Sequence, residues 1–291
     1  MKRLLITGAS GFLGWHICQL AKSTWEIYGT YSAHYLEIPG INLLKVNLTD
    51  FQAIKSLFRE VQPAAVIHAA AQSSPNFCQI HPEISHTINV TAACNISGLC
   101  ADYAIPCAFT STDLVFNGLN PPYRETDPVC PVNHYGEQKV QAEEGMLERY
   151  PMTAVCRMPL MFGQATPTAA SFMQPFIHTL RAGRELNLFA DEFRTPISAN
   201  TAVRGLLLAL EKVHGRIHLG GKERISRYNF GRLLVEVLQL QATQLKAVRQ
   251  ADVKMAAPRP PDVSLDSAIA FALGYQPLSL REELELLKDQ I

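Results

Sequence analysis

A glycine-rich turn near the N-terminus constrains the fold of this chain more than any other feature. Gly8, Gly11 and Gly14 lie between an apolar run that ends at Thr7 and a segment with helical periodicity over residues 12–21. Glycine permits a sharp turn, a close backbone approach to a phosphate and tight packing of a helix on a strand. The start of the helix adds free N–H groups and the positive end of its dipole. An ordinary strand-to-helix turn is the alternative, but the position of the motif favours a dinucleotide site. The residues expected to contact the dinucleotide here are Gly8, Ser10, Gly11, Phe12, Leu13 and Gly14.

The rest of the first half alternates predicted strands and helices. Strands are expected at 26–31, 43–47, 65–68, 106–111 and 153–157, and the helices between them at 51–60, 86–101 and 135–149. This alternation indicates a parallel sheet that is covered on both faces. The predicted fold class is therefore α/β, a Rossmann-type doubly wound parallel sheet with a smaller C-terminal substrate-binding lobe.

The alternation ends beyond Pro159, where Pro and Gly become frequent and the expected helices (171–182, 201–213, 228–240 and 280–289) are separated by loops. We expect residues 1–158 to form the NAD(P)-binding domain and residues 159–291 to form mainly the substrate lobe. Part of 196–220 is expected to return to the first domain.

The composition indicates neither a nucleic acid nor a membrane as partner. The 291 residues carry 26 basic and 26 acidic side chains, so the formal net charge is zero, and no basic surface is expected. The apolar run after Arg3 ends at Thr7, short of the roughly 7–15 residues of a signal-peptide core. No uncharged stretch approaches the roughly 18–20 residues of a membrane span. We expect a cytoplasmic protein whose seven cysteines, without a Cys-x-x-Cys pair, are reduced thiols.

The end of the second strand should read the 2′ position of the cofactor ribose. An Asp or Glu there would accept a hydrogen bond from the 2′-hydroxyl of NAD, but residues 30–34 are Thr, Tyr, Ser, Ala and His. Hydroxyls and a histidine tolerate a 2′-phosphate better than a carboxylate does. NADP is therefore expected at Tyr31 and Ser32, with NAD as the alternative.

Tyr135 and Lys139 are the most informative candidates for catalysis. They are four residues apart in a predicted helix and therefore share one face. A phenol with a pKa of about 10 is a poor acid–base group at neutral pH, and an ammonium one turn away stabilises its phenolate. The tyrosine can then deliver a proton to a carbonyl oxygen while hydride reaches the carbon. A surface Tyr and Lys on an amphipathic helix are the alternative.

Several segments carry a resemblance to a known family. The Gly-x-x-Gly-x-x-Gly spacing resembles the extended short-chain dehydrogenase/reductases. The run FTSTDLVFNG at 109–118, together with NPPYRE at 120–125 and the Tyr135–Lys139 pair, resembles the dTDP-4-dehydrorhamnose reductase branch. RMPLMFG at 157–163, RTP at 194–196 and RPPDVSLD at 259–266 extend the resemblance over nearly the whole chain. It implies an NAD(P)H-dependent reductase of a 4-keto nucleotide sugar.

The resemblance also implies roles for individual residues. Thr112 corresponds to the Ser/Thr that hydrogen-bonds the substrate carbonyl and completes a triad with Tyr135 and Lys139, and Ser111 is its possible replacement. Arg194 and Arg259 either pair with a nucleotide diphosphate, whose oxygens a guanidinium matches, or bond loop carbonyls. Gln72 would face the cofactor or substrate. Lys139 would also hold the nicotinamide ribose. Further implied cofactor contacts are Asn47, Leu48, Ala69, Ala70, Ala71 and Pro159, while Asp50 either flanks the adenine or caps the next helix.

The chain departs from this branch at three places. The family often has aspartate where Asn200 stands and an aromatic residue where Leu114 stands, and 72–76 is not the expected rhamnose-pathway sequence. These departures do not affect the expected fold and cofactor, but they leave the sugar open.

Two other functions fit parts of the sequence. NPPYRE and the run after Val46-Asn47-Leu48 also resemble the regulatory β subunit of methionine adenosyltransferase, a cofactor-binding partner of another enzyme. A Tyr-x-x-x-Lys pair is compatible with the reductase and with this regulatory subunit alike. Epimerase or dehydratase chemistry usually needs an added acid–base group, and no Glu follows Thr112, although Asp113 is adjacent. A homodimer or a complex with a partner enzyme remains open. No metal site is expected, because the histidines at 68, 81 and 86 lack partners at ligand spacing.

Overall fold

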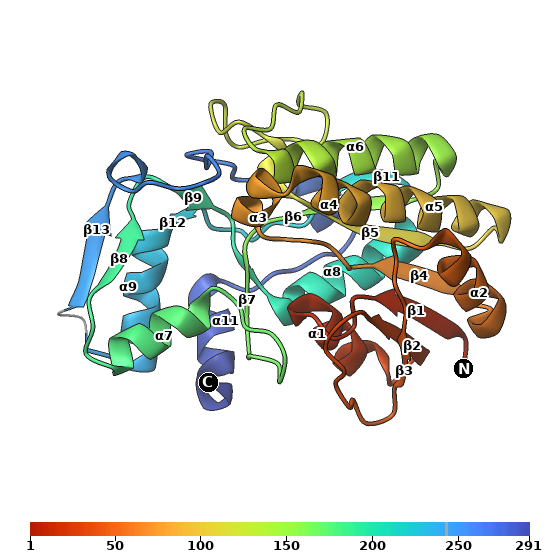
Figure 1. The fold of residues 1–291 in the computed structure, drawn as a ribbon. Helices are drawn as coiled ribbons and strands as arrows, with labels where there is room; N and C mark the ends of the chain where they lie inside the picture. The colour runs from red at the N-terminus through yellow and green to blue at the C-terminus, as the bar shows by residue number, and fades with distance from the viewer. Residues whose placement is uncertain (242–243) are drawn as a thin grey trace.

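A parallel sheet forms the centre of the protein. The computed structural model describes residues 1–241 and 244–291, and within these residues the main sheet has seven strands (Figure 1). In spatial order they are β11 (Gly215–His218), β6 (Ala154–Met158), β5 (Cys107–Thr112), β4 (Ala65–His68), β1 (Arg3–Thr7), β2 (Glu26–Tyr31) and β3 (Asn42–Lys45). The strand order reverses between β1 and β4, where doubly wound sheets bind their ligands. The predicted Rossmann-type α/β fold is confirmed.

Helices cover both faces of this sheet. In Figure 1, α5 (Ala92–Asp102) and α6 (His134–Arg149) lie above the sheet, and α1 (Phe12–Ala21) and α8 (Ala199–Lys212) lie below it. α2 (Phe51–Val61) packs on the same face as α5. Each face therefore has its own apolar core.

The pattern of β1 explains why both faces are covered. Leu4 and Ile6 belong to the buried cluster beneath α1 and α8, whereas Leu5 belongs to the cluster beneath α2, α5 and α6. Alternate side chains of a strand point to opposite faces, so an unbroken apolar run requires a helix layer on each side.

The C-terminal half adds small strand pairs beside the main sheet. β7 (Met161–Phe162) pairs with β10 (Ile197–Ser198), β9 (Phe193–Arg194) with β12 (Ile225–Ser226), and β8 (Leu186–Phe189) with β13 (Leu245–Val248). The further helices are α7 (Met173–Arg181), α9 (Arg227–Leu238), α10 (Ala268–Ala272) and α11 (Leu280–Leu287). Phe162, Met173, Phe230 and Leu284 form a separate apolar cluster in this half. The same half supplies strand β11 to the main sheet and helix α8 to one of its faces.

The predicted helix at 86–101 begins earlier and is not regular. α3 (Pro75–Ile80) precedes α4 (Pro82–His86), and α4 continues through a π-helical turn, η1 (Thr87–Thr91), into α5. Proline at the first helical turn starts both short helices, because its missing N–H is not needed there. π turns often occur at functional sites, and this one directs Asn89 inward, where it is 1% exposed.

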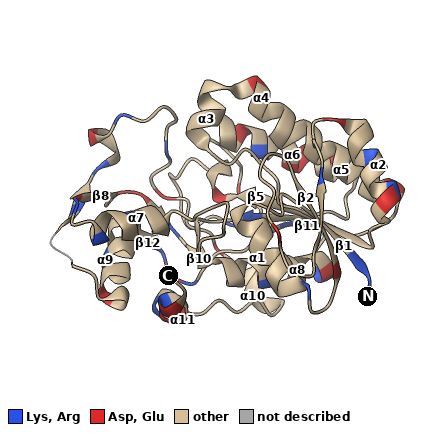
Figure 2. Cartoon of the chain, turned by 60° about the horizontal axis from the view of Figure 1, so that its bottom comes forward, with Lys and Arg blue, Asp and Glu red and all other residues tan. Residues whose placement is uncertain are grey.

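Charged side chains of both signs are interspersed over the two halves of the chain (Figure 2). Within the described residues, every helix is too short or too polar to cross a bilayer.

Candidate functional site

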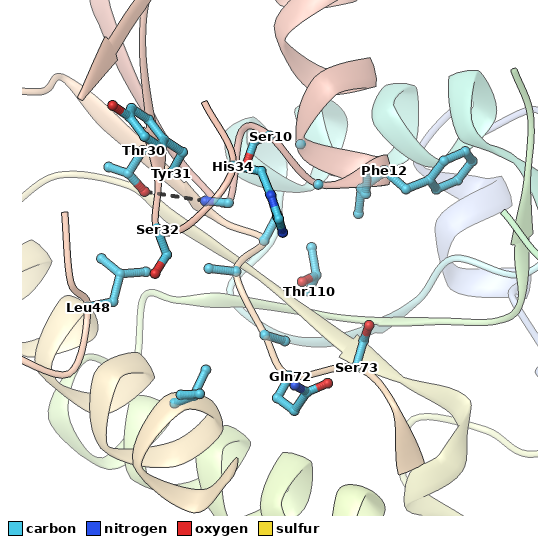
Figure 3. A pocket seen from close by; sticks show the side chains of 18 of the residues that line it. Ser10, Phe12, Thr30, Tyr31, Ser32, His34, Leu48, Gln72, Ser73 and Thr110 are labelled. Atoms are coloured by element: carbon cyan, nitrogen blue, oxygen red, sulfur yellow. Dashed lines mark hydrogen bonds between the residues drawn. The ribbon is translucent and has the colours of Figure 1, made fainter. Parts of the chain in front are cut away.

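A large cleft opens at the carboxyl ends of the central strands. Its volume is about 830 Å³, and its walls come from the turns after β1, β2, β3 and β4 together with β5 and α6 (Figure 3). The expected residues that line it are Gly8, Ser10, Gly11, Phe12, Leu13, Gly14, Tyr31, Ser32, Asn47, Leu48, Ala69, Ala70, Ala71, Gln72, Ser111, Tyr135 and Lys139. The expected residues that do not line it are Thr112, Pro159, Arg194 and Arg259.

The glycine turn presents bare backbone to the cleft. A Cβ on Gly14 would lie 2.1 Å from the carbonyl oxygen of Gly8, and a Cβ on Gly8 would lie 2.8 Å from Cα of Ala70. Gly8 also has a φ of 72°, a conformation that side-chain-bearing residues rarely adopt. No side chain caps the start of α1, and its first turn has no acidic residue. Its N–H groups are thus available for a phosphate.

The Thr7 hydroxyl joins the ends of β1 and β4. Its oxygen accepts hydrogen bonds from the backbone N–H groups of Ala69 and Ala70, each at 3.2 Å. Its proton therefore points to Nδ1 of His68, 2.6 Å away. Burial lowers the pKa of His68 to about 3, so the ring stays neutral with its proton on Nε2. These bonds fix the small-residue turn at 69–71 directly under the glycine turn.

The wall beside the end of β2 carries hydroxyls and a histidine. Tyr31, Ser32 and His34 line it, and Thr30 Oγ1 accepts a hydrogen bond from the Gly8 N–H at 3.3 Å (Figure 3). Among the described residues that line the cleft there is no Asp or Glu. The cleft therefore lacks the carboxylate that would repel a 2′-phosphate.

Asp50 takes the helix-cap position rather than a place in the cleft. Its Oδ1 accepts hydrogen bonds from the N–H groups of Gln52 and Ala53 at 2.9 and 3.2 Å. Asn47 and Leu48 reach the wall of the cleft instead.

Lys139 is buried at the inner end of the cleft. Asn133 caps α6 by accepting a hydrogen bond from the Gly136 N–H at 2.9 Å, and the helix then carries Tyr135 and Lys139 to the cleft on consecutive turns. Nζ of Lys139 donates to the carbonyl of Thr110 at 2.8 Å and lies 4.4 Å from the ring centroid of Phe109. Burial lowers the pKa of Lys139 to about 8.

Tyr135 keeps its proton in this environment. Burial raises the pKa of the phenol above its ordinary range, the neighbouring groups Cys78 and Asp113 act in the same direction, and a hydrogen bond with Thr112 opposes them. The ammonium of Lys139 lies 6.0 Å from the centroid of the phenol ring and is bonded to a carbonyl instead. A protonated phenol suits a proton donor, because the oxygen that receives the proton gains negative charge during reduction.

The hydroxyls of Ser111 and Thr112 have different partners. Ser111 donates to Glu143 Oε1 at 2.5 Å, and a hydroxyl used in this way cannot donate to a substrate carbonyl as well. Thr112 accepts from the Leu114 N–H at 3.2 Å and makes a longer bond of 3.3 Å to Asp113 Oδ1. Ser111 is thus committed to Glu143 although it lines the cleft, whereas Thr112 has only the longer bond as a donor but does not line the cleft.

Both candidate arginines form their hydrogen bonds and ion pairs within the protein. Arg194 is 5% exposed, donates to a backbone carbonyl at 2.8 Å and has Nε 3.4 Å from Asp113 Oδ2. Arg259 donates to the carbonyl of Ala257 at 3.2 Å and to Oδ1 of Asn76 at 3.1 Å. These contacts correspond to the loop-bonding alternative. Pro159 follows β6, and its neighbours at 160 and 161 line the cleft in its place.

Sequence reasoning missed one wall of the cleft. Ser171 and Phe172, from the loop before α7, line it, and the Thr168 hydroxyl of the same loop donates to the carbonyl of Ser10 at 2.6 Å. An irregular loop carries no motif that could have indicated this contact. The other lining residues that were not predicted are Val46, Thr49, Ser73, Ile88, Thr110 and Ala170. Thr30, Ala33, His34, Leu160 and Met161 also line the cleft and belong to the segments 30–34 and 157–163, which had been singled out from the sequence.

Asn89 connects the turn after β4 to the helix that carries Tyr135 and Lys139. Its side-chain amide pairs with the backbone of Gln72, accepting from the N–H at 2.8 Å and donating to the carbonyl at 3.1 Å. It also donates to Gln138 Oε1 at 2.9 Å, and Gln138 lies between Tyr135 and Lys139 on α6.

In the described part of the chain, no group of three or more His, Cys, Asp or Glu residues is placed to hold a metal ion.

A Rossmann-type sheet, a bare glycine turn and a Tyr-x-x-x-Lys pair facing one cleft define the class of the extended short-chain dehydrogenase/reductases. Within that class, the chain belongs to the family described as RmlD substrate binding domain, which matches residues 1–291.

Relatives of the chain include both a probable reductase and the beta subunit of a methionine adenosyltransferase. It is 30% identical to "Probable low-salt glycan biosynthesis reductase Agl14" of Haloferax volcanii over 97% of this chain and 96% of that protein. It is 28% identical to "Methionine adenosyltransferase 2 subunit beta" of Xenopus laevis over 94% of this chain and 83% of that protein. A similar solved structure is dTDP-4-dehydrorhamnose reductase from Bacillus anthracis in complex with NADP, with a TM-score of 0.89, 22% identity and 100% coverage of both chains.

Proposed function

We propose that this protein is an oxidoreductase that uses a reduced nicotinamide dinucleotide to reduce the keto group of a 4-keto nucleotide sugar. The observation that carries the proposal is the placement of Tyr135 and Lys139 on the wall of the cleft that also contains the bare glycine turn. The similarity to a probable reductase over nearly the whole chain supports it.

The cleft fits a dinucleotide. The turn at Gly8–Gly14 leaves room for a pyrophosphate where a Cβ would collide with backbone, and Tyr31, Ser32 and His34 surround the expected 2′ position. The absence of a lining carboxylate in the described chain favours NADP, with NAD as the alternative. When bound, the reduced nicotinamide supplies a hydride to the substrate carbon.

The side chains divide the remaining chemistry among them. Tyr135 donates its proton to the substrate oxygen as that oxygen gains negative charge. Lys139 stabilises the phenolate that remains and binds the cofactor ribose. Thr112 donates a hydrogen bond to the same substrate oxygen and orients it. Each role depends on a hydrogen bond that forms when substrate enters, and we expect small side-chain movements at Thr112 and Tyr135 on binding.

The substrate lobe is assigned to residues 159–291, apart from the portion of 196–220 that joins the main sheet, with residues 1–158 as the cofactor domain. Arg194 or Arg259 would bind a nucleotide diphosphate after exchanging a protein carbonyl for a phosphate oxygen. Gln72 would contact the sugar or the nicotinamide. A cytoplasmic location belongs to the same proposal.

The direct test uses purified protein. NADPH and NADH are titrated by fluorescence, 4-keto sugar nucleotides are added, and oxidation of the cofactor is followed by absorbance. We expect oxidation that depends on the keto sugar. Tyr135→Phe should lower kcat by about 10²-fold or more with nearly unchanged cofactor affinity, whereas Tyr103→Phe, at a 40% exposed tyrosine, should leave both unchanged. Full activity of Tyr135→Phe would contradict the assignment of the proton donor.

A regulatory subunit is the second candidate, because the similarity to methionine adenosyltransferase 2 subunit beta covers 94% of the chain. In that case the protein should bind NADPH tightly without oxidising it across the substrate panel. It should also elute with a methionine adenosyltransferase catalytic subunit in size-exclusion chromatography. The same column distinguishes a monomer from a homodimer.

A further inference from the structure

A third ionisable side chain lies on the face of α6 that carries Tyr135 and Lys139. Glu143 follows Lys139 by four residues, so the three side chains project from consecutive turns. The Glu143 side chain is only 1% exposed. A buried carboxylate is costly unless charged and hydrogen-bonded partners surround it, so its partners indicate what its charge does.

Those partners come from three strands of the main sheet. Arg157 of β6 donates to both carboxylate oxygens of Glu143, through Nε at 3.0 Å and Nη2 at 2.7 Å. Arg216 of β11 donates at 3.1 Å, and Ser111 of β5 donates its hydroxyl at 2.5 Å. The two arginines balance the charge, but Ser111 is a wall residue of the cleft. The hydrogen bonds of the Glu143 carboxylate therefore connect strands β6 and β11 to Ser111 at the reaction centre.

The groups around Lys139 give the carboxylate a second role. His68 of β4 and the Cys78 thiol of α3 face Lys139, and both are uncharged at neutral pH, because burial lowers the pKa of His68 and raises that of Cys78. Burial acts to deprotonate Lys139, and the negative charge of Glu143 acts against it. Tyr135, on the preceding turn, keeps its proton. Glu143 is thus the main charge opposing the effect of burial on Lys139.

The cations near Glu143 leave this role intact. Arg157 is buried with it, and Arg216 is 35% exposed, so water screens its charge in part. His218 also lies beside Arg157, and burial lowers its pKa to about 4, which makes it neutral at the pH of interest.

We propose that Glu143 is a positioning residue of the reaction centre, which orients the Ser111 hydroxyl at the cleft and keeps the neighbouring Lys139 side chain in its ammonium form. Its kinetic consequences rest on the proposed reductase function. The charge state of Lys139, however, can be measured without turnover.

Glu143→Gln tests the charge while keeping the shape. Protein labelled with 13C at lysine Cε is titrated by NMR, and the Lys139 signal is assigned by its absence from Lys139→Met. Because a nearby unit charge is worth about 1–3 kcal/mol at an effective dielectric constant of about 20, and one pKa unit corresponds to about 1.4 kcal/mol, loss of the carboxylate should lower the titration midpoint of Lys139 by about one pH unit. Glu144→Gln, at the next and exposed position of the same helix, should not move it. Glu143→Asp, which keeps the charge, should restore at least half of the shift.

The kinetic readout follows from the same shift. If the protein is a reductase, the alkaline limb of kcat against pH should move down by about one unit in Glu143→Gln and stay in place in Glu144→Gln. An unchanged Lys139 midpoint in folded Glu143→Gln overturns the inference, whether or not the protein oxidises NADPH. Absence of NADPH oxidation in the wild-type protein would instead contradict the proposed function and leave the NMR result valid.

Glu143→Gln leaves Arg157 without its charge partner and could prevent folding. In that case Arg157→Met is compared with Arg157→Met/Glu143→Gln, which contains no unpaired buried arginine at this place. The difference between their Lys139 midpoints isolates the carboxylate. We expect the variant that retains Glu143 to titrate about one unit higher, and equal midpoints overturn the inference.

Discussion

Two buried histidines should make the fold sensitive to mild acid. Burial lowers the pKa of His68 to about 3 and that of His218 to about 4, whereas an unfolded chain has about 6.5 at both. Between these values the unfolded chain binds more protons than the folded protein, so stability falls as the pH falls. Besides burial, the nearby ammonium of Lys139 disfavours a positive charge on His68, and the Arg157 guanidinium, 3.5 Å from Nε2, disfavours one on His218.

The size of the effect follows from these values. From pH 7 to pH 5, each histidine removes about 2 kcal/mol from the free energy of unfolding. Asp113 acts in the opposite direction, because burial raises its pKa to about 6 and the folded protein takes up that proton over the same range, which returns about 1 kcal/mol. His16, with a pKa lowered by burial, adds to the loss, and Glu283, with a pKa raised by burial, adds to the gain. The net expectation is a loss of about 2–3 kcal/mol.

Urea unfolding at pH 7 and pH 5, at constant ionic strength, measures this difference. His218→Gln should lose only about a third as much or less between the two pH values, because glutamine can donate to the same carbonyls and accept from Arg157 without titrating. A wild-type free energy of unfolding that is equal or higher at pH 5 would refute the reasoning. An unchanged difference in His218→Gln would show that His218 is not one of the groups responsible.

Two further predictions concern the glycine turn, which we propose binds the cofactor phosphates, and the Thr7 hydroxyl beside it. Gly14→Ala should weaken NADPH binding by more than about 10-fold, because its Cβ would lie 2.1 Å from the Gly8 carbonyl oxygen and the turn must open. Gly98→Ala in α5, whose Cβ would meet its nearest neighbour at 3.7 Å, is the control and should keep the wild-type affinity. Thr7→Val should cost about 2–3 kcal/mol in urea unfolding, because it leaves the part-buried N–H groups of Ala69 and Ala70 without an acceptor and the buried His68 Nδ1 without a donor. Thr7→Ser should cost less than half of that, and equal losses would mean that the hydroxyl is not the cause.

Local patterns in the sequence were enough for the sheet and for much of the cleft. The glycine turn, the strands at Arg3–Thr7, Glu26–Tyr31 and Ala65–His68 and the helix at Phe12–Ala21 appear where they were predicted. Each depends on short-range physics, namely an apolar run, a glycine that relieves a collision or a period of 3.6 residues. The Tyr135–Lys139 pair was equally visible, because residues four apart in a helix share a face whatever surrounds them.

Contacts between distant segments could not be predicted in the same way. Asn89 looks like one polar residue in a helical pattern, and only its position in a π-helical turn brings it to Gln72 and Gln138. The protonation state of Tyr135 could not be predicted from the sequence pattern either, because it depends on burial and on the carbonyl to which the Lys139 ammonium is hydrogen-bonded. The loop that brings Phe172 to the cleft has no periodicity at all.

The end of β5 explains how one strand can organise this centre. Its last three residues each meet a different part of the neighbouring structure. The carbonyl of Thr110 accepts from Lys139 at 2.8 Å, the Ser111 hydroxyl donates to Glu143 at 2.5 Å, and the Thr112 hydroxyl caps the following turn beside Tyr135. Because three turns of α6 meet three consecutive residues of β5, a shift of either element disturbs all three pairs together. The Glu143 carboxylate, which accepts from Ser111 of β5, Arg157 of β6 and Arg216 of β11, therefore connects α6 to three strands at the point where the reacting groups meet.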